Sequence, residues 1–335
     1  MHEIEALSQR IRNKIIDIPS KRIRIANLVD TPQEKDLKKR PTCDGFGRVH
    51  HFERATDDRW PPNPLPMDPA CKALGLPPTN LMTAHVFQCA GCDSHCWYCF
   101  VPPELLNGNP DRSAWFTASE MLDLYLAQPD PPKMIDLSGG EPGLVPEWVL
   151  WMMHELEDRQ LDSSVYLWSD DNLTCNYFWT VLTDKQREFL CSYRKYGKVA
   201  CLKGFSSESF AFNTSLDSSL FQRRIHNLRQ YVALDLDLYV YVTLTAPSIG
   251  RVKDEMSWFV DLLQDLNPNL PLRTVPLLIR NYTPTKARLT TERLLAFENQ
   301  YAAAECWIDE LSRRYSPEVR AMNIADVPLG VRGRS

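Results

Sequence analysis

Six short apolar segments, rich in β-branched and aromatic residues, recur along this chain, and a stretch with helical character follows each of them. The expected strands cover residues 81–88, 134–137, 164–168, 199–202, 238–245 and 272–280. Regular alternation of strand and helix favours a parallel sheet with helices packed outside it. Right-handed crossovers would curl that sheet. The sequence therefore predicts an α/β fold, namely a partial barrel of six βα units.

The expected helices cover residues 117–128, 146–159, 174–196, 216–233, 252–266 and 290–314. Residues 1–80 stand outside the alternation. They begin with a short amphipathic helix and an extended segment, and residues 40–80 are so rich in proline that an irregular loop is expected. We therefore predict an N-terminal extension over 1–80 that wraps or lids the core, a barrel over 81–285, and a C-terminal helix and tail over 286–335.

The composition is that of an ordinary globular protein, with 44% apolar and 24% charged residues among 335. No apolar run approaches the about 20 residues that span a bilayer, and the N-terminal residues lack the apolar core of a signal peptide. A cytoplasmic protein with no membrane partner is expected. The net charge of −5 gives no overall footprint for nucleic acid, although residues 1–40 carry a balance of +4. A solvated helix face is the commoner reason for such a basic segment.

Three cysteines follow the first expected strand at x3 and x2 spacing: Cys92, Cys96 and Cys99. In (β/α) barrels the chemistry lies at the C-terminal ends of the strands, where this loop is expected. Three thiolates on one tight loop suit a 4Fe–4S cluster whose fourth iron has no protein ligand. A zinc site is the alternative, with Cys89 or His95 as the fourth ligand. Ten cysteines in a cytosolic chain indicate metal ligands and buried thiols rather than disulfides.

The second expected strand ends at Ser138-Gly139-Gly140-Glu141-Pro142. Two glycines permit positive φ and a close approach of the backbone, so free backbone groups there could bind a cationic ammonium. Glu141 adds charge or orientation, and Pro142 stiffens the exit from the turn. A plain strand exit is the alternative for such a turn taken alone.

Together, the Cys-x3-Cys-x2-Cys loop and the Gly-Gly-Glu-Pro turn resemble the radical S-adenosylmethionine (SAM) superfamily, and the resemblance covers roughly residues 81–285. It implies a partial (β/α)6 barrel in which Cys92, Cys96 and Cys99 bind a 4Fe–4S cluster. It also implies that Gly139, Gly140, Glu141 and Pro142 hold the ammonium of SAM. Tyr98 occupies a position that is usually aromatic in the superfamily, with its backbone near the adenine.

Three further residues are candidates for contacts with SAM: Ser169, Asp171 and Lys203. The first two lie in the polar turn 169–172 after the third strand, where a helix N-cap is the alternative role. Leu202-Lys203-Gly204 is similar to a segment of the glycyl-radical-enzyme activases in which the lysine faces the SAM pocket, although Cys201 replaces the preceding aspartate. A solvated lysine is the alternative.

The resemblance implies an enzyme that reductively cleaves SAM at the cluster to a 5′-deoxyadenosyl radical, which abstracts a hydrogen atom from a small molecule, a nucleotide or a protein glycine. An electron donor such as flavodoxin or ferredoxin is the implied partner. An activase acting on a partner protein is one alternative, and a non-catalytic zinc-binding interaction protein is another. No catalytic residue towards the substrate can be named. If a second metal site existed, Cys43, Cys71 and Cys89 would be its only plausible ligands.

Overall fold

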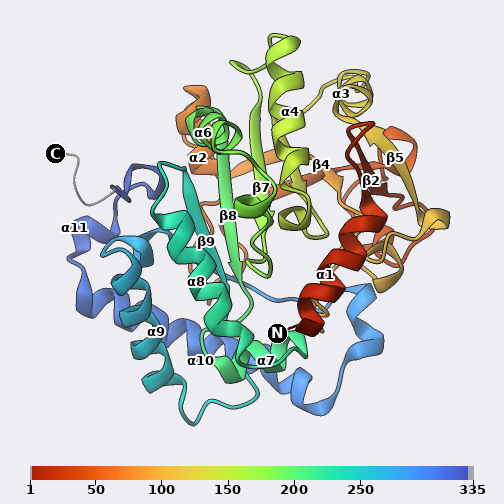
Figure 1. Ribbon diagram of the computed structural model, residues 1–335. Helices are drawn as coiled ribbons and strands as arrows, with labels where there is room; N and C mark the ends of the chain where they lie inside the picture. The colour runs from red at the N-terminus through yellow and green to blue at the C-terminus, as the bar shows by residue number, and fades with distance from the viewer. Residues whose placement is uncertain (1, 331–335) are drawn as a thin grey trace.

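The computed structural model describes residues 2–330 of the chain. Its main sheet has seven strands in the order β10-β9-β8-β7-β6-β4-β3. The strands are β3 (Gly47–Glu53), β4 (Leu81–Gln88), β6 (Met134–Ser138), β7 (Tyr166–Asp171), β8 (Tyr196–Leu202), β9 (Leu238–Thr243) and β10 (Thr274–Leu277). All neighbouring pairs from β4 to β10 are parallel. The predicted α/β architecture is therefore confirmed, although the sheet has seven strands because β3 joins its edge (Figure 1).

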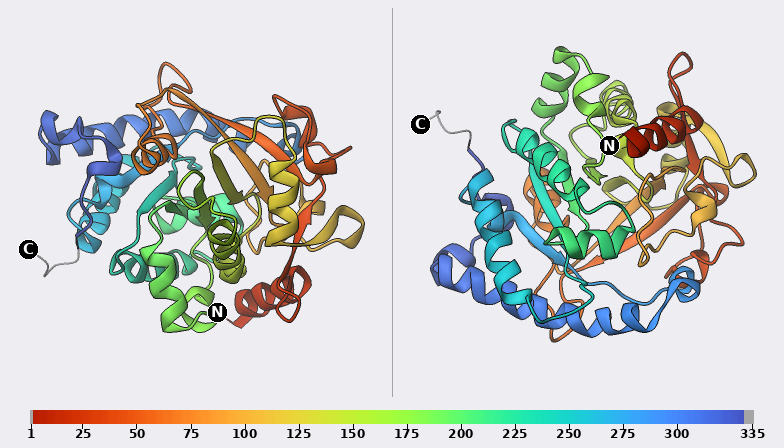
Figure 2. Two further views of the ribbon diagram at one scale, coloured as in Figure 1. Left: turned by 90° about the horizontal axis from the view of Figure 1, so that it is seen from above. Right: turned by 60° about the horizontal axis from the view of Figure 1, so that its bottom comes forward.

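Helices cover the outer face of this curled sheet, and we call its inner, concave side the lumen (Figure 2). They are α3 (Ala118–Leu126), α4 (Pro146–Asp158), α5 (Tyr177–Thr180), α6 (Asp184–Ser192), α7 (Ser207–Thr214), α8 (Leu220–Val232), α9 (Val252–Leu266) and α10 (Thr291–Arg314). The predicted helix over 174–196 is wrong as one element, because a capping box at Thr183 starts a new helix after α5. Helix α7 was not predicted.

Strand alternation sorts the side chains into two layers. Ile135, Leu137 and Leu167 belong to the large core under the helices, whereas Met134, Tyr166 and Trp168 belong to a separate cluster in the lumen. Because successive residues of a strand point to opposite faces, Asp136 and Asp170 share the lumen face with that second cluster.

The prediction of an irregular loop over 40–80 is wrong in two places, since β3 and helix α2 (Met67–Leu74) form there. Strand β3 pairs antiparallel with β4 over its full length, from Gly47 opposite Phe87 to Glu53 opposite Leu81. The prolines are confined to the segments on either side of β3. Proline cannot donate to a strand ladder, and its absence from 47–53 leaves that stretch free to pair.

The start of the extension forms a second unit against the barrel. Helix α1 (His2–Ile15) leads into β1 (Ile16–Asp17) and β2 (Arg22–Ala26), and β2 pairs antiparallel with β5 (Ser113–Thr117) in a three-stranded sheet. Arg12 on α1 forms a buried ion pair with Glu147 on α4 and donates to the Leu144 carbonyl at 2.6 Å. The N-terminal residues are therefore fastened to the barrel wall.

The rest of the extension crosses the open side of the curled sheet, between its edge strands β3 and β10. Trp60 Nε1 donates to the Pro276 carbonyl at 3.1 Å, and Asn63 Nδ2 donates to the Tyr241 hydroxyl at 3.1 Å. Asp36 accepts a hydrogen bond from the backbone N–H of Thr283 at 2.7 Å. Figure 2 shows this orange segment beside the blue C-terminal part of the chain. These contacts join the segment to β9, to β10 and to the turn after β10, and the division into an extension and a core stays a prediction.

The end of the barrel at which the strands begin is covered by α2 and by the C-terminal residues. Lys72 Nζ donates to the Ala325 carbonyl at 2.7 Å, and Arg273 Nε donates to the Val327 carbonyl at 2.7 Å. The predicted C-terminal tail thus contains α11 (Pro317–Arg320), and its residues 325 and 327 contact the barrel. The last residues of the predicted tail, 331–335, lie outside the described part.

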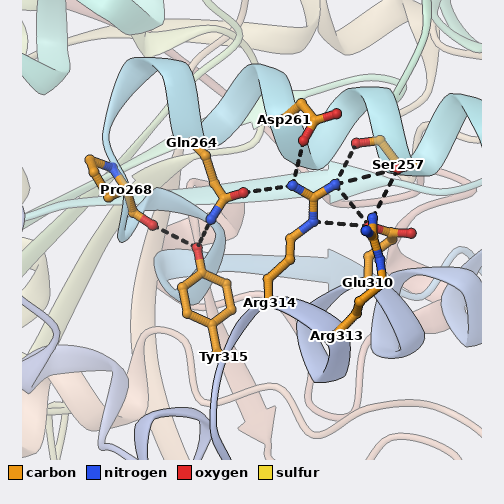
Figure 3. A network of polar contacts seen from close by, with 8 residues as sticks. All are labelled: Ser257, Asp261, Gln264, Pro268, Glu310, Arg313, Arg314 and Tyr315. Atoms are coloured by element: carbon orange, nitrogen blue, oxygen red, sulfur yellow. Dashed lines mark hydrogen bonds and ion pairs between the residues drawn. The ribbon is translucent and has the colours of Figure 1, made fainter.

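Helix α10 ends where the sequence predicts, and a polar network fixes its end to α9 (Figure 3). Arg314 donates to Gln264 at 2.7 Å, to Glu310 at 2.9 Å and to the Ser257 carbonyl at 3.0 Å, and it also contacts Asp261. One guanidinium with several planar donors can satisfy this many acceptors at once. None of the described helices combines the length and the apolar character needed to cross a bilayer.

Candidate functional site

The three predicted metal ligands lie on one buried loop after β4, at the C-terminal end of the parallel strands. The side chains of Cys92 and Cys96 are 8% and 6% exposed, and Cys99 is half-buried. The three thiols lie within electrostatic range of one another. Burial raises the pKa of Cys92 and Cys99, so these thiols favour the protonated form until a cation replaces the proton.

The sulfur of Cys92 already receives two hydrogen bonds. The backbone N–H of Ser94 lies 3.4 Å from it, and the side-chain amide of Asn172 lies 3.6 Å from it. Hydrogen bonds to a ligand sulfur stabilise its negative charge and tune the reduction potential of an iron–sulfur cluster. The polar turn after β7 thus reaches the cysteine loop, as expected for residues at neighbouring strand ends.

The Gly-Gly-Glu-Pro turn packs directly against the start of the cysteine loop. The N–H of Glu141 donates to the Gly91 carbonyl at 2.7 Å, and Gly139 has φ +83°. A Cβ atom on Gly140 would lie 2.3 Å from the carbonyl oxygen of Cys89 and 2.5 Å from that of Gly91. Only glycine permits this approach, so the glycine turn is in backbone contact with the residues immediately before Cys92.

Glu141 is buried and uses both carboxylate oxygens within the protein. One accepts from the N–H of Gly143 at 2.8 Å, and the other accepts from the N–H of Asn172 at 2.9 Å. Burial and the nearby Asp171 raise the pKa of Glu141. In this arrangement Glu141 joins the glycine turn to the end of β7, and its contact with SAM stays a prediction.

Aromatic side chains shield the cysteine loop from solvent. Trp97 is 1% exposed and makes edge contacts with Tyr98, Phe212 and Phe297. The Tyr98 hydroxyl lies 3.0 Å from Thr243 Oγ1 at the end of β9. A dry shell of this kind lowers the local dielectric constant around a metal centre.

Ser169 and Asp171 occupy the helix-facing side of β7. The Ser169 hydroxyl lies 2.7 Å from the Tyr196 hydroxyl, and Asp171 forms a buried ion pair with Lys198 at 2.9 Å. Asp171 also accepts from the Tyr231 hydroxyl at 2.8 Å. Both side chains therefore have protein partners, and their contact with SAM stays a prediction. Between them in sequence, Asp170 faces the lumen, which a period-two count from Tyr166 and Trp168 could have revealed.

Lys203 follows β8 and lies within electrostatic range of the cysteine loop. Burial alone would lower its pKa, but Cys201, Tyr98 and the loop thiols raise it. The lysine is thus charged and partly shielded beside the three expected ligands. This position is compatible with pairing a carboxylate of a bound molecule.

Two arginines that sequence reasoning missed hold the cysteine loop in place. Arg224 on α8 is 1% exposed and donates to Ser94 at 3.2 Å and to the Asn172 carbonyl at 2.8 Å. Arg288 donates to the Cys96 carbonyl at 3.0 Å and also to the carbonyl of Cys99. Both lie more than a hundred residues along the chain from the loop, and no local pattern marks them.

The alternative zinc ligands do not gather with the three cysteines. His95 is exposed, and Cys89 points to the core under the helices. Within residues 3–330, no three His, Cys, Asp or Glu side chains are placed to hold a single metal ion. A cubane cluster differs in this respect, because each thiolate binds a different iron atom and the sulfurs stand further apart. The three free thiols of the loop, which lie within electrostatic range of one another, fit such a cluster in number and donor type.

Cys43, Cys71 and Cys89 do not form a common group. Cys43 lies 3.5 Å from His85 Nε2 behind the sheet, and Cys71 is on α2 at the opposite end of the barrel. All three thiols have pKa values that burial raises. They behave as buried apolar side chains.

Comparison with known proteins yields little. No family model matches the chain, and no curated protein matches it in sequence. Among solved structures, SuiB of Streptococcus suis, crystallised with S-adenosylmethionine, aligns at 15% identity with a TM-score of 0.39. The alignment covers 54% of this chain and 37% of SuiB, so it spans little more than a third of that protein. A likeness of this extent leaves the family of this chain open.

Proposed function

We propose that this chain is a radical SAM enzyme that holds a 4Fe–4S cluster on Cys92, Cys96 and Cys99 and binds SAM against the Gly-Gly-Glu-Pro turn. One observation carries the proposal: the cysteine loop and the glycine turn are in backbone contact at the C-terminal end of a parallel sheet. The two sequence motifs are about forty residues apart, and their meeting is what a shared site requires. A 4Fe–4S cluster held by these three cysteines would supply the one-electron reduction that cleavage of bound SAM requires.

In this proposal the residues of the chain bind and orient SAM, and they exclude water from the site. Gly139 and Gly140 let a ligand approach the backbone, and Glu141 fixes the turn to Asn172. Asn172 and Ser94 stabilise the thiolate of Cys92. Trp97 and Tyr98 keep the centre dry, which prevents side reactions of a radical. Lys203 is the candidate for a carboxylate of SAM.

A small molecule is a better candidate for the substrate than a protein backbone. The segment over 54–66 crosses the open side of the barrel, and α2 covers the end at which the strands begin. A glycine of a partner protein would have to pass the segment over 54–66 to reach the inner side of the sheet. An activase that acts on a partner protein is therefore the second candidate function. A cytoplasmic electron donor such as flavodoxin or ferredoxin would serve either reaction.

The proposal is tested by anaerobic reconstitution with iron and sulfide, followed by addition of dithionite and SAM. We expect brown protein with broad absorption near ~400 nm and formation of 5′-deoxyadenosine. Cys96→Ala should lose iron and product together, because two thiolates cannot hold the cluster, whereas Cys306→Ala on α10 should retain both.

Colourless protein that contains zinc would contradict the cluster assignment. An intact cluster without nucleoside product would contradict the reaction while leaving the ligands in place. If Cys96→Ala kept its full iron content, the assigned set of ligands would be wrong.

A further inference from the structure

The lumen of the barrel contains charged side chains that the site above does not use. Arg48 on β3 lies opposite Val86 of β4, and Asp136 on β6 is also opposite Val86, so the two side chains flank the same position of the sheet. Asp170 follows on β7, on the same face. Arg48 and Asp136 are 7% and 5% exposed.

Within the described chain, each of these two buried residues keeps one polar atom without a partner, although Nη1 of Arg48 lies 3.0 Å from Nδ1 of His50. Oδ1 of Asp136 and Nε of Arg48 have no hydrogen-bond partner among residues 3–330. The described side chains form no ion pair within 4.0 Å of either residue, although each lies within electrostatic range of the other. An unpaired buried charge costs several kcal/mol, so a native structure retains one chiefly where a ligand completes it.

The charged and titratable groups around Arg48 and Asp136 indicate which kind of ligand would complete them. The groups that face this part of the lumen are His50 from β3, Asp170 from β7, Lys203 after β8, Tyr241 from β9, and Tyr282 after β10. Among them, Lys203 is the strongest cationic influence on Asp170. His50 is neutral, because burial lowers its pKa to about 3. Arg48 and Asp136 influence each other electrostatically but form no ion pair, so Nε of Arg48 and Oδ1 of Asp136 remain without a direct partner among the described residues.

From this arrangement we propose that the lumen binds a small zwitterion of the amino-acid type. Its carboxylate is held by Arg48, and its ammonium is held by Asp136. Each charge of the ligand then meets one charge of the protein, and both orphaned atoms gain a hydrogen-bond partner. The inference rests on the proposed function, for which it names the class of substrate.

The position of Arg48 connects this ligand to the cysteine loop. Phe100, the residue after Cys99, lies over the guanidinium of Arg48 with 5.6 Å between the guanidinium carbon and the ring centroid. Phe100 also contacts Tyr282, with ring centroids 5.0 Å apart. A molecule held by Arg48 therefore lies beneath the loop that carries the expected cluster ligands, which is where a substrate for hydrogen abstraction must be.

The test measures binding to the full chain, before and after cluster reconstitution, by thermal shift and calorimetry. The probes are the standard L-amino acids, with propionate and ethylamine as single-charge analogues of L-alanine. We expect at least one amino acid to bind saturably, and L-alanine to bind more tightly than either analogue. Arg48→Met and Asp136→Asn should each weaken the binding of the best amino acid by at least about tenfold.

The matched controls are Arg40→Met and Asp265→Asn, which alter exposed residues and should leave binding unchanged. Circular dichroism shows whether each variant folds, and Arg48→Lys replaces Arg48→Met if the latter does not. A folded chain that binds none of the amino acids overturns the proposal, as does equal binding by the lumen and control variants. A chain that carries a cluster but fails this test leaves the proposed function intact, and zwitterion binding without any cluster would refute only that function.

Discussion

Asp136 gives a sharp prediction, because its carboxyl group is buried in the lumen without an ion-pair partner. Desolvation and the neighbouring Asp170 raise its pKa from 3.8 to about 8. Between these values the folded protein holds a proton that the unfolded chain has released. Since the folded state then binds more protons, this group makes the protein less stable as pH rises. The slope reaches about 1.4 kcal/mol per pH unit.

Asparagine cannot titrate, so Asp136→Asn removes that slope. Relative to the parent, the variant should gain about 2 to 3 kcal/mol of unfolding free energy between about pH 5.5 and about pH 7.5. Any cost of burying the new amide is the same at every pH, so it does not alter this slope. The measurement is urea unfolding of the metal-free, reduced protein at several pH values, with m held constant as a check on two-state behaviour.

The matched control is Asp265→Asn, an exposed residue on α9. The unfolding free energy of this control should differ from that of the parent by the same amount at every pH. Suppose that the unfolding free energies of Asp136→Asn and the parent differed by the same amount at every pH. The carboxyl of Asp136 would then be ionised in the folded state. The effect of burial and of Asp170 on the pKa of this carboxyl would then be smaller than we infer.

Three further substitutions probe the contacts that position the site. Glu147→Gln leaves the buried Arg12 without its counter-charge, so we expect a loss of about 3 kcal/mol in urea unfolding, whereas the exposed Glu188→Gln should change little. Gly140→Ala places a methyl group against two backbone carbonyls, so reconstituted protein should bind less iron although its cysteines are intact, while Gly250→Ala, with open space around it, should bind iron normally. Arg314→Leu breaks the network between α9 and α10 and should cost about 1 to 3 kcal/mol. Arg313→Leu, whose side chain is 62% exposed, should cost less than about 1 kcal/mol. Equal losses for the two arginine variants would contradict the importance given to burial in that network.

The sequence predicted the parallel sheet well, because each βα unit is encoded locally. Apolar runs such as Leu238–Thr243 form strands wherever they are buried, and signals such as the capping box at Thr117 start the helices that follow. It failed for β3, since Gly47–Glu53 carries two histidines and an arginine and reads as polar loop. Pairing with β4, rather than any property of the segment, makes it a strand.

The candidate site likewise combines features that the sequence predicts with features that only the fold decides. The spacing of Cys92, Cys96 and Cys99 by itself determined that three thiols share one loop, and the glycine turn was evident from adjacent residues. Only the tertiary structure decided that Arg224 and Arg288 hold that loop, because they reach it from distant helices and turns. It also decided that Arg48 and Asp136 face one lumen. Strand register and the curl of the sheet set which side chains meet, and both depend on contacts between residues far apart in the chain.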